Sequence, residues 1–298
     1  MTKIYDVQWE LGAHTQFSGR ISDTLRVGIN YGMYALQFFM GNPQGFKRST
    51  ISKEDLAKCH ELLDKFPVHV FSHFPYVANL AGSVSQIAWD GNEEQDSKTT
   101  KILKSLEYEL GILGNFASER CRSGVVIHPG AYKNRAKGLE AISKSINKIN
   151  FPKSSKLILE NASGQGNALA TTFRELKTII DGVEEKKREH IGICVDTCHI
   201  FAYGDYNLSK IEEIDRLFSD FDKIIGLDKF TLLHLNDSET KFTGKVDRHA
   251  CLGTGFIWQK NFDSLVHLLN TCKKHGIPAV LETHGRDMLT VAGLAREV

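Results

Sequence analysis

The chain has 298 residues, of which 41% are hydrophobic and 24% charged, and its formal net charge is +1. This composition excludes a disordered chain, and the near-zero charge gives no general attraction to nucleic acid. No stretch approaches the roughly 18 apolar residues of a membrane helix, and the first residues lack the apolar core of a signal peptide, so we expect a soluble intracellular protein without a membrane partner.

The six cysteines are Cys59, Cys121, Cys194, Cys198, Cys251 and Cys272. Because they are scattered along the chain, we expect reduced thiols rather than a disulfide framework. Cytoplasm, nucleus and a viral particle or factory are all compatible with this expectation. Cys194 and Cys198 lie four positions apart, but no second pair repeats that spacing, so a four-cysteine zinc site is not expected.

Short apolar runs recur along the chain and predict eight parallel strands. In chain order they are Val7–Ala13, Tyr34–Phe39, Val68–Ser72, Gly124–Ile127, Lys156–Leu159, Ile191–Val195, Thr231–Leu233 and Pro278–Leu281. Several runs are apolar on consecutive positions, as in Val125-Val-Ile, which is typical of strands that are covered on both faces.

Amphipathic segments between these runs predict crossover helices. The clearest are Lys53–Phe66, Lys98–Phe116, Phe173–Val183 and Ile211–Ile225, where apolar residues recur three and four positions apart. Ala81–Asp96 is polar and contains glycine, so we expect a long irregular insertion there. Alternating strands and helices, with eight strands in all, predict an α/β fold: a (β/α)₈ TIM barrel in which residues 1–298 form one catalytic domain.

Six of the predicted strands are followed at once by a residue type that binds metals. These residues are His73, His128, Glu160, Asp196, His234 and Glu282. Each alone has an ordinary structural explanation, such as a hydrogen-bonded histidine or a helix N-cap. Strand ends converge on one face of a barrel, however, and burying so many such groups together without a cation would be costly. The pattern therefore predicts a metal cluster.

Two short motifs add a further set of ligand types. Asp196-Thr-Cys-His199 places a carboxylate and an imidazole three positions apart, and Asp247-Arg-His249 places another pair two positions apart in an extended loop. His199, Asp247 and His249 form a candidate three-ligand set. Imidazole with carboxylate suits Zn²⁺, and also Mn²⁺ or Fe²⁺, and three protein ligands leave room for water and substrate.

At these motifs the chain resembles the endonuclease IV family of abasic-site endonucleases, which belongs to the xylose-isomerase-like TIM barrels. The resemblance runs in order along nearly the whole chain. It is carried by the segments Ser72–Leu80, Ile127–Gly130, Leu159–Gly166, Gly192–His199, His234–Asp237, Val246–His249 and Leu281–Thr283. The blocks D-T-C-H, H-L-N-D and D-R-H are highly specific in combination.

The resemblance implies three zinc ions per chain, and every family ligand position is filled in this sequence. The first zinc would take His73, His128 and Glu160. The second would take Glu160 as a bridge together with Asp196, His234 and Glu282. The third would take His199, Asp247 and His249. Glu160 and Glu282 are also expected to be the catalytic carboxylates.

The activity that the resemblance implies is zinc-dependent hydrolysis of DNA in base excision repair. The phosphodiester 5′ to an abasic site would be cut, leaving a 3′-hydroxyl and a 5′-deoxyribose phosphate. Removal of blocking groups from 3′ ends is implied as a second activity. The expected partner is therefore double-stranded DNA with abasic sites or blocked 3′ ends, and a monomer is expected.

Several residues match family positions that contact DNA. Tyr76 and Val77 follow His73 at the positions of the minor-groove wedge, and Arg248 is expected to contact phosphate. His14 is expected at the rim or floor of the pocket, where a structural hydrogen bond is an equal alternative. Tyr76, Val77 and His14 are assigned from the resemblance alone, and Arg248 is assigned from its positive charge near the mouth of the barrel.

The segment from Asn42 to Arg48 departs from the family. Asn42 and Gln44 are expected to contact DNA, but Gln44 stands where bacterial relatives insert an arginine into the base stack. Insertion into the abasic gap is therefore open between Gln44, Lys47 and Arg48.

Two rival functions remain. A sugar isomerase or epimerase of the xylose-isomerase-like barrels also places carboxylates and histidines at strand ends, but those enzymes need at most two metals. The set His199, Asp247 and His249 therefore argues against it. A binding module without catalysis would have no need of the complete set of ligand types.

Overall fold

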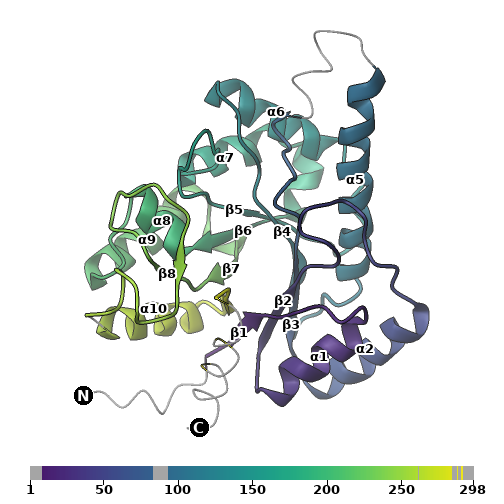
Figure 1. Cartoon of the computed structure of the whole chain (residues 1–298), viewed down its shortest axis with the longest axis horizontal. Coiled ribbons are helices and arrows are strands. Elements are labelled where there is room, and N and C mark those ends of the chain that lie inside the picture. The colour runs from purple at the N-terminus through teal and green to yellow at the C-terminus, as the bar shows by residue number, and fades with distance from the viewer. Residues whose placement is uncertain (1–8, 83–92, 261, 284–286, 288–289, 291–298) are drawn as a thin grey trace.

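The computed structural model describes residues 9–82, 93–260, 262–283, 287 and 290. Eight of its strands are parallel and close into a barrel, as Figure 1 shows. In their order around the ring they are β1 (Leu11–His14), β2 (Ala35–Phe38), β3 (His69–His73), β4 (Ser123–Ile127), β5 (Leu157–Glu160), β6 (Ile191–Asp196), β7 (Phe230–His234) and β10 (Ala279–Leu281). The predicted (β/α)₈ barrel is confirmed. Each predicted strand overlaps an observed one, and Val7 lies outside the described residues.

Helices surround the ring of strands (Figure 1). They are α1 (Ile21–Asn30), α2 (Lys53–Lys65), α5 (Glu93–Leu113), α6 (Arg135–Asn147), α7 (Phe173–Gly182), α8 (Thr197–Tyr203), α9 (Ile211–Ile224) and α10 (Phe262–Lys274), with short 3₁₀ turns at Glu185–His190 and Leu227–Lys229. The four predicted helices are confirmed with small differences at their ends. The predicted irregular insertion is wrong over Glu93–Asp96, which begins α5, and residues 83–92 of that insertion lie outside the described residues.

Two apolar layers hold the barrel together. The larger layer lies between the strands and the helices and includes Leu36, Val125 and Leu157. The smaller layer fills the inside of the ring with one residue from each of seven strands: Ala35, Phe71, Val126, Ile158, Cys194, Leu232 and Val280. We call this inner layer the plug. It explains why the strands are apolar on consecutive positions, since each strand is buried on both faces.

A small antiparallel pair lies beyond β7. It consists of β8 (Asp237–Ser238) and β9 (His249–Ala250), with Ser238 opposite His249. The long connection between them carries Asp247 back toward the barrel. Among the helices that the structure describes, none is both long and apolar enough to cross a membrane.

Candidate metal centre

A layer of polar side chains lies next to the plug at the carboxyl ends of the strands. In each of seven strands, the residue two positions after the plug residue is polar: Gln37, His73, His128, Glu160, Asp196, His234 and Glu282. Because side chains alternate along a strand, residues two apart point to the same side, which here is the inside of the barrel. Strand register therefore brings these seven side chains into one layer on an apolar floor.

All nine predicted ligands come together in three groups. The ligand atoms within each group lie within 4.8 Å of one another. The groups are His73, His128 and Glu160; Glu160, Asp196, His234 and Glu282; and His199, Asp247 and His249. The division into groups is the one that the sequence resemblance implies.

Glu160 lies between the first two groups. Its Oε2 atom is 3.2 Å from Nε2 of His73 and 3.5 Å from Nε2 of His128. Its Oε1 atom is 3.1 Å from Nδ1 of His234, which belongs to the second group. Oε1 is also 3.4 Å from Nδ1 of His199, so the two oxygens of this carboxylate face different groups, as the bridging role implied by the resemblance requires.

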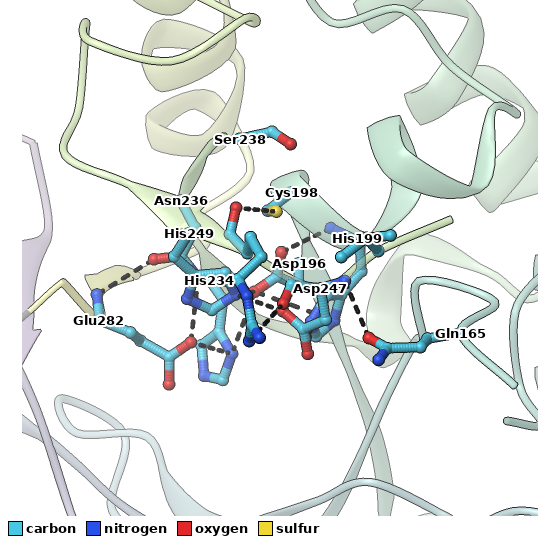
Figure 2. Close-up of polar contacts among 12 residues, drawn as sticks. Gln165, Asp196, Cys198, His199, His234, Asn236, Ser238, Asp247, His249 and Glu282 are labelled. Atoms are coloured by element: carbon cyan, nitrogen blue, oxygen red, sulfur yellow. Dashed lines mark hydrogen bonds and ion pairs between the residues drawn. The ribbon is translucent and has the colours of Figure 1, made fainter. Parts of the chain in front are cut away.

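The third group takes His199 from α8, Asp247 from the loop before β9 and His249 from β9 itself, and Figure 2 shows the three side chains. The two oxygens of Asp247 lie 3.0 Å from Nε2 of His199 and 3.2 Å from Nε2 of His249. Nε2 of His249 is also 3.6 Å from Oδ2 of Asp196, which joins this group to the second. Asp196 has a further role, because its Oδ1 accepts from the backbone N–H of His199 at 2.8 Å and caps α8.

Carbonyl oxygens fix the orientation of two of the imidazole rings. Nδ1 of His73 lies 2.8 Å from the Phe74 carbonyl, and Nδ1 of His199 lies 2.9 Å from the Asn161 carbonyl. Since a carbonyl only accepts, each ring must donate at that nitrogen, and a neutral ring then turns a lone pair toward the carboxylates. Two acceptors that face each other need a cation between them, either a proton or a metal ion.

Two buried nitrogens mark the place where a metal ion fits best. Nε2 of His199 and Nε2 of His249 are buried and have no hydrogen-bond partner among the residues that the structure describes, although the Asp247 carboxylate is close to both. The distances are short, but the alignment is not that of hydrogen bonds. Carboxylate and imidazole donors with this arrangement suit zinc, so the residues present fit the implied metal.

Three histidines of this cluster, His199, His234 and His249, hold protons more tightly than usual when no metal is bound. Burial alone would lower the pKa of both His199 and His234. Nearby carboxylates outweigh burial at His199, and Cys194 together with Glu282 and Glu160 outweighs it at His234, so both pKa values lie well above the usual range. Burial opposes the shift at His249 as well, yet Asp196 and Asp247 raise its pKa to about 9. His128 differs, because burial lowers its pKa to about 4.

Most of the carboxylates in the cluster stay ionised. Burial would raise the pKa of Glu160, Glu282 and Asp247, but the surrounding histidines lower all three below the usual range. Burial raises the pKa of Asp196. Without a metal, protons on His199, His234 and His249 therefore balance part of the negative charge of the carboxylates, and metal ions would take the place of these protons.

Two neutral amides that contact the candidate ligands, Gln37 and Asn236, were not predicted as site residues. Gln37 donates from Nε2 to Oε1 of Glu282 at 2.6 Å and accepts at Oε1 from Nε2 of His234 at 2.9 Å. Asn236 donates from Nδ2 to Oδ2 of Asp196 at 2.7 Å and to Oε2 of Glu282 at 3.0 Å. Strand register could have identified Gln37, which stands two positions after the plug residue Ala35. Both amides hold candidate ligands in place.

Asp237 fixes the loop that follows β9. Its buried carboxylate accepts backbone N–H groups from Ser238 at 2.8 Å, Gly253 at 3.1 Å, Gly255 at 3.0 Å and Ile257 at 2.9 Å. Because Asp237 lies in β8 opposite Ala250, these bonds also set the position of His249.

Cys198 lies beside the cluster but is a poor ligand. Its sulfur is close enough to Asp196 and His249 to form a further possible group. The buried thiol donates instead to the Arg248 carbonyl at 3.5 Å, and burial raises its pKa, so it stays protonated. Like the other cysteines, which are all in the described part of the chain, it forms no disulfide.

The cluster opens into two adjoining cavities. One, of about 290 Å³, is lined by candidate ligands together with Tyr76 and Arg248. The other, of about 380 Å³, is lined by Val77, Ala131, Gln165 and Leu169 among others, and it shares Tyr76 with the first. Tyr76 is 54% exposed, and its ring contacts that of His73 at 5.4 Å. Tyr76 thus lies where the two cavities adjoin, between the metal centre and the second cavity.

The remaining predicted site residues fall into two places. His14 lies on the floor, nearly buried, with Nδ1 3.8 Å from Oε1 of Glu282 and 3.1 Å from Nε2 of Gln37. Arg248 lines the first cavity, while Asn42 and Gln44 are exposed in the segment that follows β2 and line neither cavity. Arg48 is not placed to enter a DNA duplex, because its guanidinium is buried against Glu109 at 3.0 Å.

Comparison with known proteins adds family and fold relationships. The family model described as a xylose isomerase-like TIM barrel matches residues 26–297. The "Probable endonuclease 4" of Clostridium botulinum is 33% identical over 278 residues, covering 92% of this chain and 92% of that protein. Endonuclease IV from Thermus thermophilus superposes with a TM-score of 0.75 at 22% identity, covering 96% of this chain and 97% of that one.

A D-tagatose 3-epimerase-like protein has a TM-score of 0.63 at 18% identity, and the match covers 96% of both chains. At such identities the two solved structures are informative about the fold alone.

Proposed function

Because this chain belongs to the endonuclease IV family of the xylose isomerase-like TIM barrels, we propose that it is a zinc-dependent endonuclease of base excision repair. It would hydrolyse the phosphodiester 5′ to an abasic site, leaving a 3′-hydroxyl and a 5′-deoxyribose phosphate, and would also clear blocked 3′ ends. Residues 1–298 would act as one catalytic domain and as a monomer. The relatives named endonuclease 4 support the nuclease activity.

The observation that carries this proposal is the third ligand group. This group consists of His199, Asp247 and His249. The Nε2 atoms of its two histidines are buried and lack hydrogen-bond partners among the described residues. A sugar isomerase or epimerase, the alternative function, needs at most two metals and has no use for this group. The alternative therefore leaves the most specific part of the cluster unexplained.

Three zinc ions would be held by the three groups, with Glu160 as the bridge between the first and second. Mn²⁺ or Fe²⁺ would suit some of the same ligands. When bound, zinc supplies Lewis acidity, which lowers the pKa of water and neutralises negative charge on a phosphate. The positive charge of the ions also compensates for a chain whose net charge is only +1.

The protein's own residues would orient the reacting groups. The side chain of Glu282 is 11% exposed and that of Glu160 is 1% exposed, so Glu282 is the one that can accept a hydrogen bond from an attacking water. Its lowered pKa keeps it ionised and able to accept. Gln37 and Asn236 each hold one of its oxygens, which restricts its rotation.

DNA would be contacted from the rim of the barrel. Tyr76 and Val77, which line the second cavity, would act as the wedge, and Asn42, Gln44 and Arg248 would contact the duplex. A sugar without a base leaves the stack at lower free-energy cost than a paired nucleotide, which favours abasic sites over intact DNA.

The direct test uses a DNA duplex that carries one tetrahydrofuran abasic analogue. This analogue cannot undergo β-elimination, so a cut on its 5′ side must be hydrolytic. We expect a cut that leaves a 3′-hydroxyl, disappears with a strong chelator and returns with zinc, while a matched duplex with an intact nucleotide stays uncut. Absence of cleavage by zinc-loaded protein would reject the proposal and favour a screen of small sugars.

A further inference from the structure

The segment between β2 and α2 forms a closed loop beside the metal centre. Gly41 and Arg48 form an antiparallel bridge, and the N–H of Ser49 donates to the Met40 carbonyl at 3.0 Å. The loop starts close to Phe39, whose ring lies 5.2 Å from that of Tyr76. Residues 41–48, which we call the β2 loop, therefore follow β2 at the carboxyl end of the barrel, the end that also carries Tyr76.

The guanidinium of Arg48 binds the inside of the β2 loop. Its NH2 group donates to the carbonyl of Asn42 at 3.1 Å and to the carbonyl of Gly45, and Nε donates to the carbonyl of Phe46 at 3.3 Å. Three carbonyls of one short loop thus converge on one planar cation. A guanidinium can satisfy them together because its donors are fixed in a fork, which an ammonium group lacks.

The same guanidinium is anchored to the barrel. NH1 of Arg48 donates to Oε1 of Glu109 at 3.0 Å, and both side chains are almost completely buried. Oε2 of Glu109 accepts from the hydroxyl of Ser72 at 2.6 Å, and Ser72 directly precedes the candidate ligand His73. Arg48 also lies over the ring of Phe74, 5.8 Å from its centre. The loop is therefore tied to the end of β3 through one buried ion pair.

The polar side chains of the loop other than Arg48 are exposed to solvent, whereas Phe46 packs against the core. Gln44 and Lys47 reach solvent, and the side-chain oxygen of Asn42 accepts from the N–H of Gln44 at 2.8 Å. Helix α5 adds further support, because Ser105 donates to the Phe46 carbonyl at 2.7 Å and Tyr108 donates to the Ser49 carbonyl at 3.1 Å. The backbone is thus fixed from inside while polar side chains face outward.

We propose that Arg48, held by Glu109, is a positioning residue that presets the β2 loop so that Asn42 and Gln44 meet damaged DNA in one fixed arrangement. The inference rests on the proposed function for its substrate. The hydrogen bonds by which Arg48 holds the β2 loop, which we call the brace, are a property of the free protein. A loop that is ordered before binding loses less conformational entropy on binding. Loss of the brace should therefore weaken DNA binding rather than the chemical step.

The first variant is Arg48→Lys, which keeps the charge opposite Glu109 but removes the fork that binds three carbonyls. We expect KM for the tetrahydrofuran duplex to rise about tenfold, with kcat and zinc content unchanged. In the Gln44→Ala background the same change should raise KM only about twofold, because its effect acts through Gln44. Glu109→Gln should reproduce the rise in KM.

Amide hydrogen exchange of the free protein tests the brace without DNA. We expect residues 41–49 to exchange faster in Arg48→Lys than in the parent. Arg122→Lys is the matched control, since Arg122 donates to the carbonyls of Phe230 and Thr231 at the opposite end of the barrel. It should change neither KM nor exchange in the β2 loop.

Two results would overturn the inference. Unchanged exchange in residues 41–49 would show that Arg48 does not hold the loop. A fall in kcat at unchanged KM would show that Arg48 acts on the metal centre instead. If the parent protein cuts no abasic duplex, the proposed function fails while the exchange measurement still decides the brace.

Discussion

The Oε1 atom of Gln37 lies 2.9 Å from Nε2 of His234, and this contact decides which nitrogen of the ring faces the carboxylates. With Nε2 donating to the amide, Nδ1 is turned toward Glu160 and Glu282, at 3.1 Å from an oxygen of each. Gln37 also donates to Glu282 at 2.6 Å. One uncharged residue of β2 therefore orients candidate ligands at the ends of β7 and β10.

Replacing Gln37 with leucine should test this role. The substitution removes the acceptor for His234 and the donor for Glu282 with little change in volume. We expect zinc affinity or cleavage rate to fall about 10- to 100-fold, as is usual when a residue that orients a metal ligand is lost. Zinc titration with a competing chelator measures the first quantity and single-turnover cleavage the second. A zinc affinity and a cleavage rate like those of the parent protein would show that the imidazole of His234 needs no support from Gln37.

Glu282→Gln and His249→Ala should each reduce cleavage about a hundredfold or more while leaving the barrel folded, because each removes part of a candidate metal shell. Circular dichroism and cleavage of the tetrahydrofuran duplex are the measurements. Glu140→Gln, which changes an exposed carboxylate on α6, is the control and should cut like the parent. Unchanged rates in both site variants would remove the basis of the assignment.

Asp237→Asn should loosen the loop that follows β9, the strand that carries His249 of the third group. The amide nitrogen would face backbone N–H groups that now donate to a carboxylate, so we expect stability to fall by about 1–3 kcal/mol. Zinc content should fall to about two ions per chain, because His249 loses its fixed position. Metal analysis after desalting measures the content. Full zinc content in a destabilised variant would show that Asp237 supports the fold but not the site.

Zinc binding should release protons near neutral pH. Without metal, the pKa of His249 is raised from 6.5 to about 9, and those of His199 and His234 are also raised, so zinc must displace protons from these rings. Apparent affinity should therefore rise with pH up to about 9. Calorimetry in buffers with different ionisation enthalpies measures the release.

The same shift has a second consequence for the protein without metal. A raised histidine pKa stabilises the fold fully below pH 6.5, and this contribution is lost as the pH rises through about 9. The metal-free protein should become less stable over that range, while the zinc-loaded protein should not. In the calorimetric measurement of zinc binding, heats that do not depend on the ionisation enthalpy of the buffer would contradict the assignment of protonated histidines.

The polar strand ends were predictable from the sequence because a strand has a simple period of two. A polar residue such as Glu160, directly after a buried apolar run, could be placed at the carboxyl end without knowledge of contacts. Gln37 also lies at the carboxyl end of its strand, but the sequence does not mark it as a site residue because a neutral amide is not a usual zinc ligand. The prediction of Asp247 and His249 depended on the D-R-H motif, because residues in a loop follow no periodic pattern from which their positions could be inferred.

Other features depend on packing between distant parts of the chain. Arg48 and Glu109 are 61 positions apart, and only the approach of α5 to the β2 loop makes them partners. The sequence therefore allowed Arg48 to be a DNA contact, which its burial excludes. Glu93–Asp96 was expected to be irregular because it is polar, but glutamate and glutamine are good helix formers.

The last candidate ligand along the chain follows the strand that completes the ring. Glu282 comes directly after β10, and β10 pairs with β1 to close the barrel. A nascent chain can therefore carry the other eight candidate ligands and still lack both the closed ring and Glu282. The barrel can close only after β10 has been synthesised, and the set of ligands is complete only with the next residue, Glu282. A chain that stops short of β10 therefore has neither a closed barrel nor a complete site.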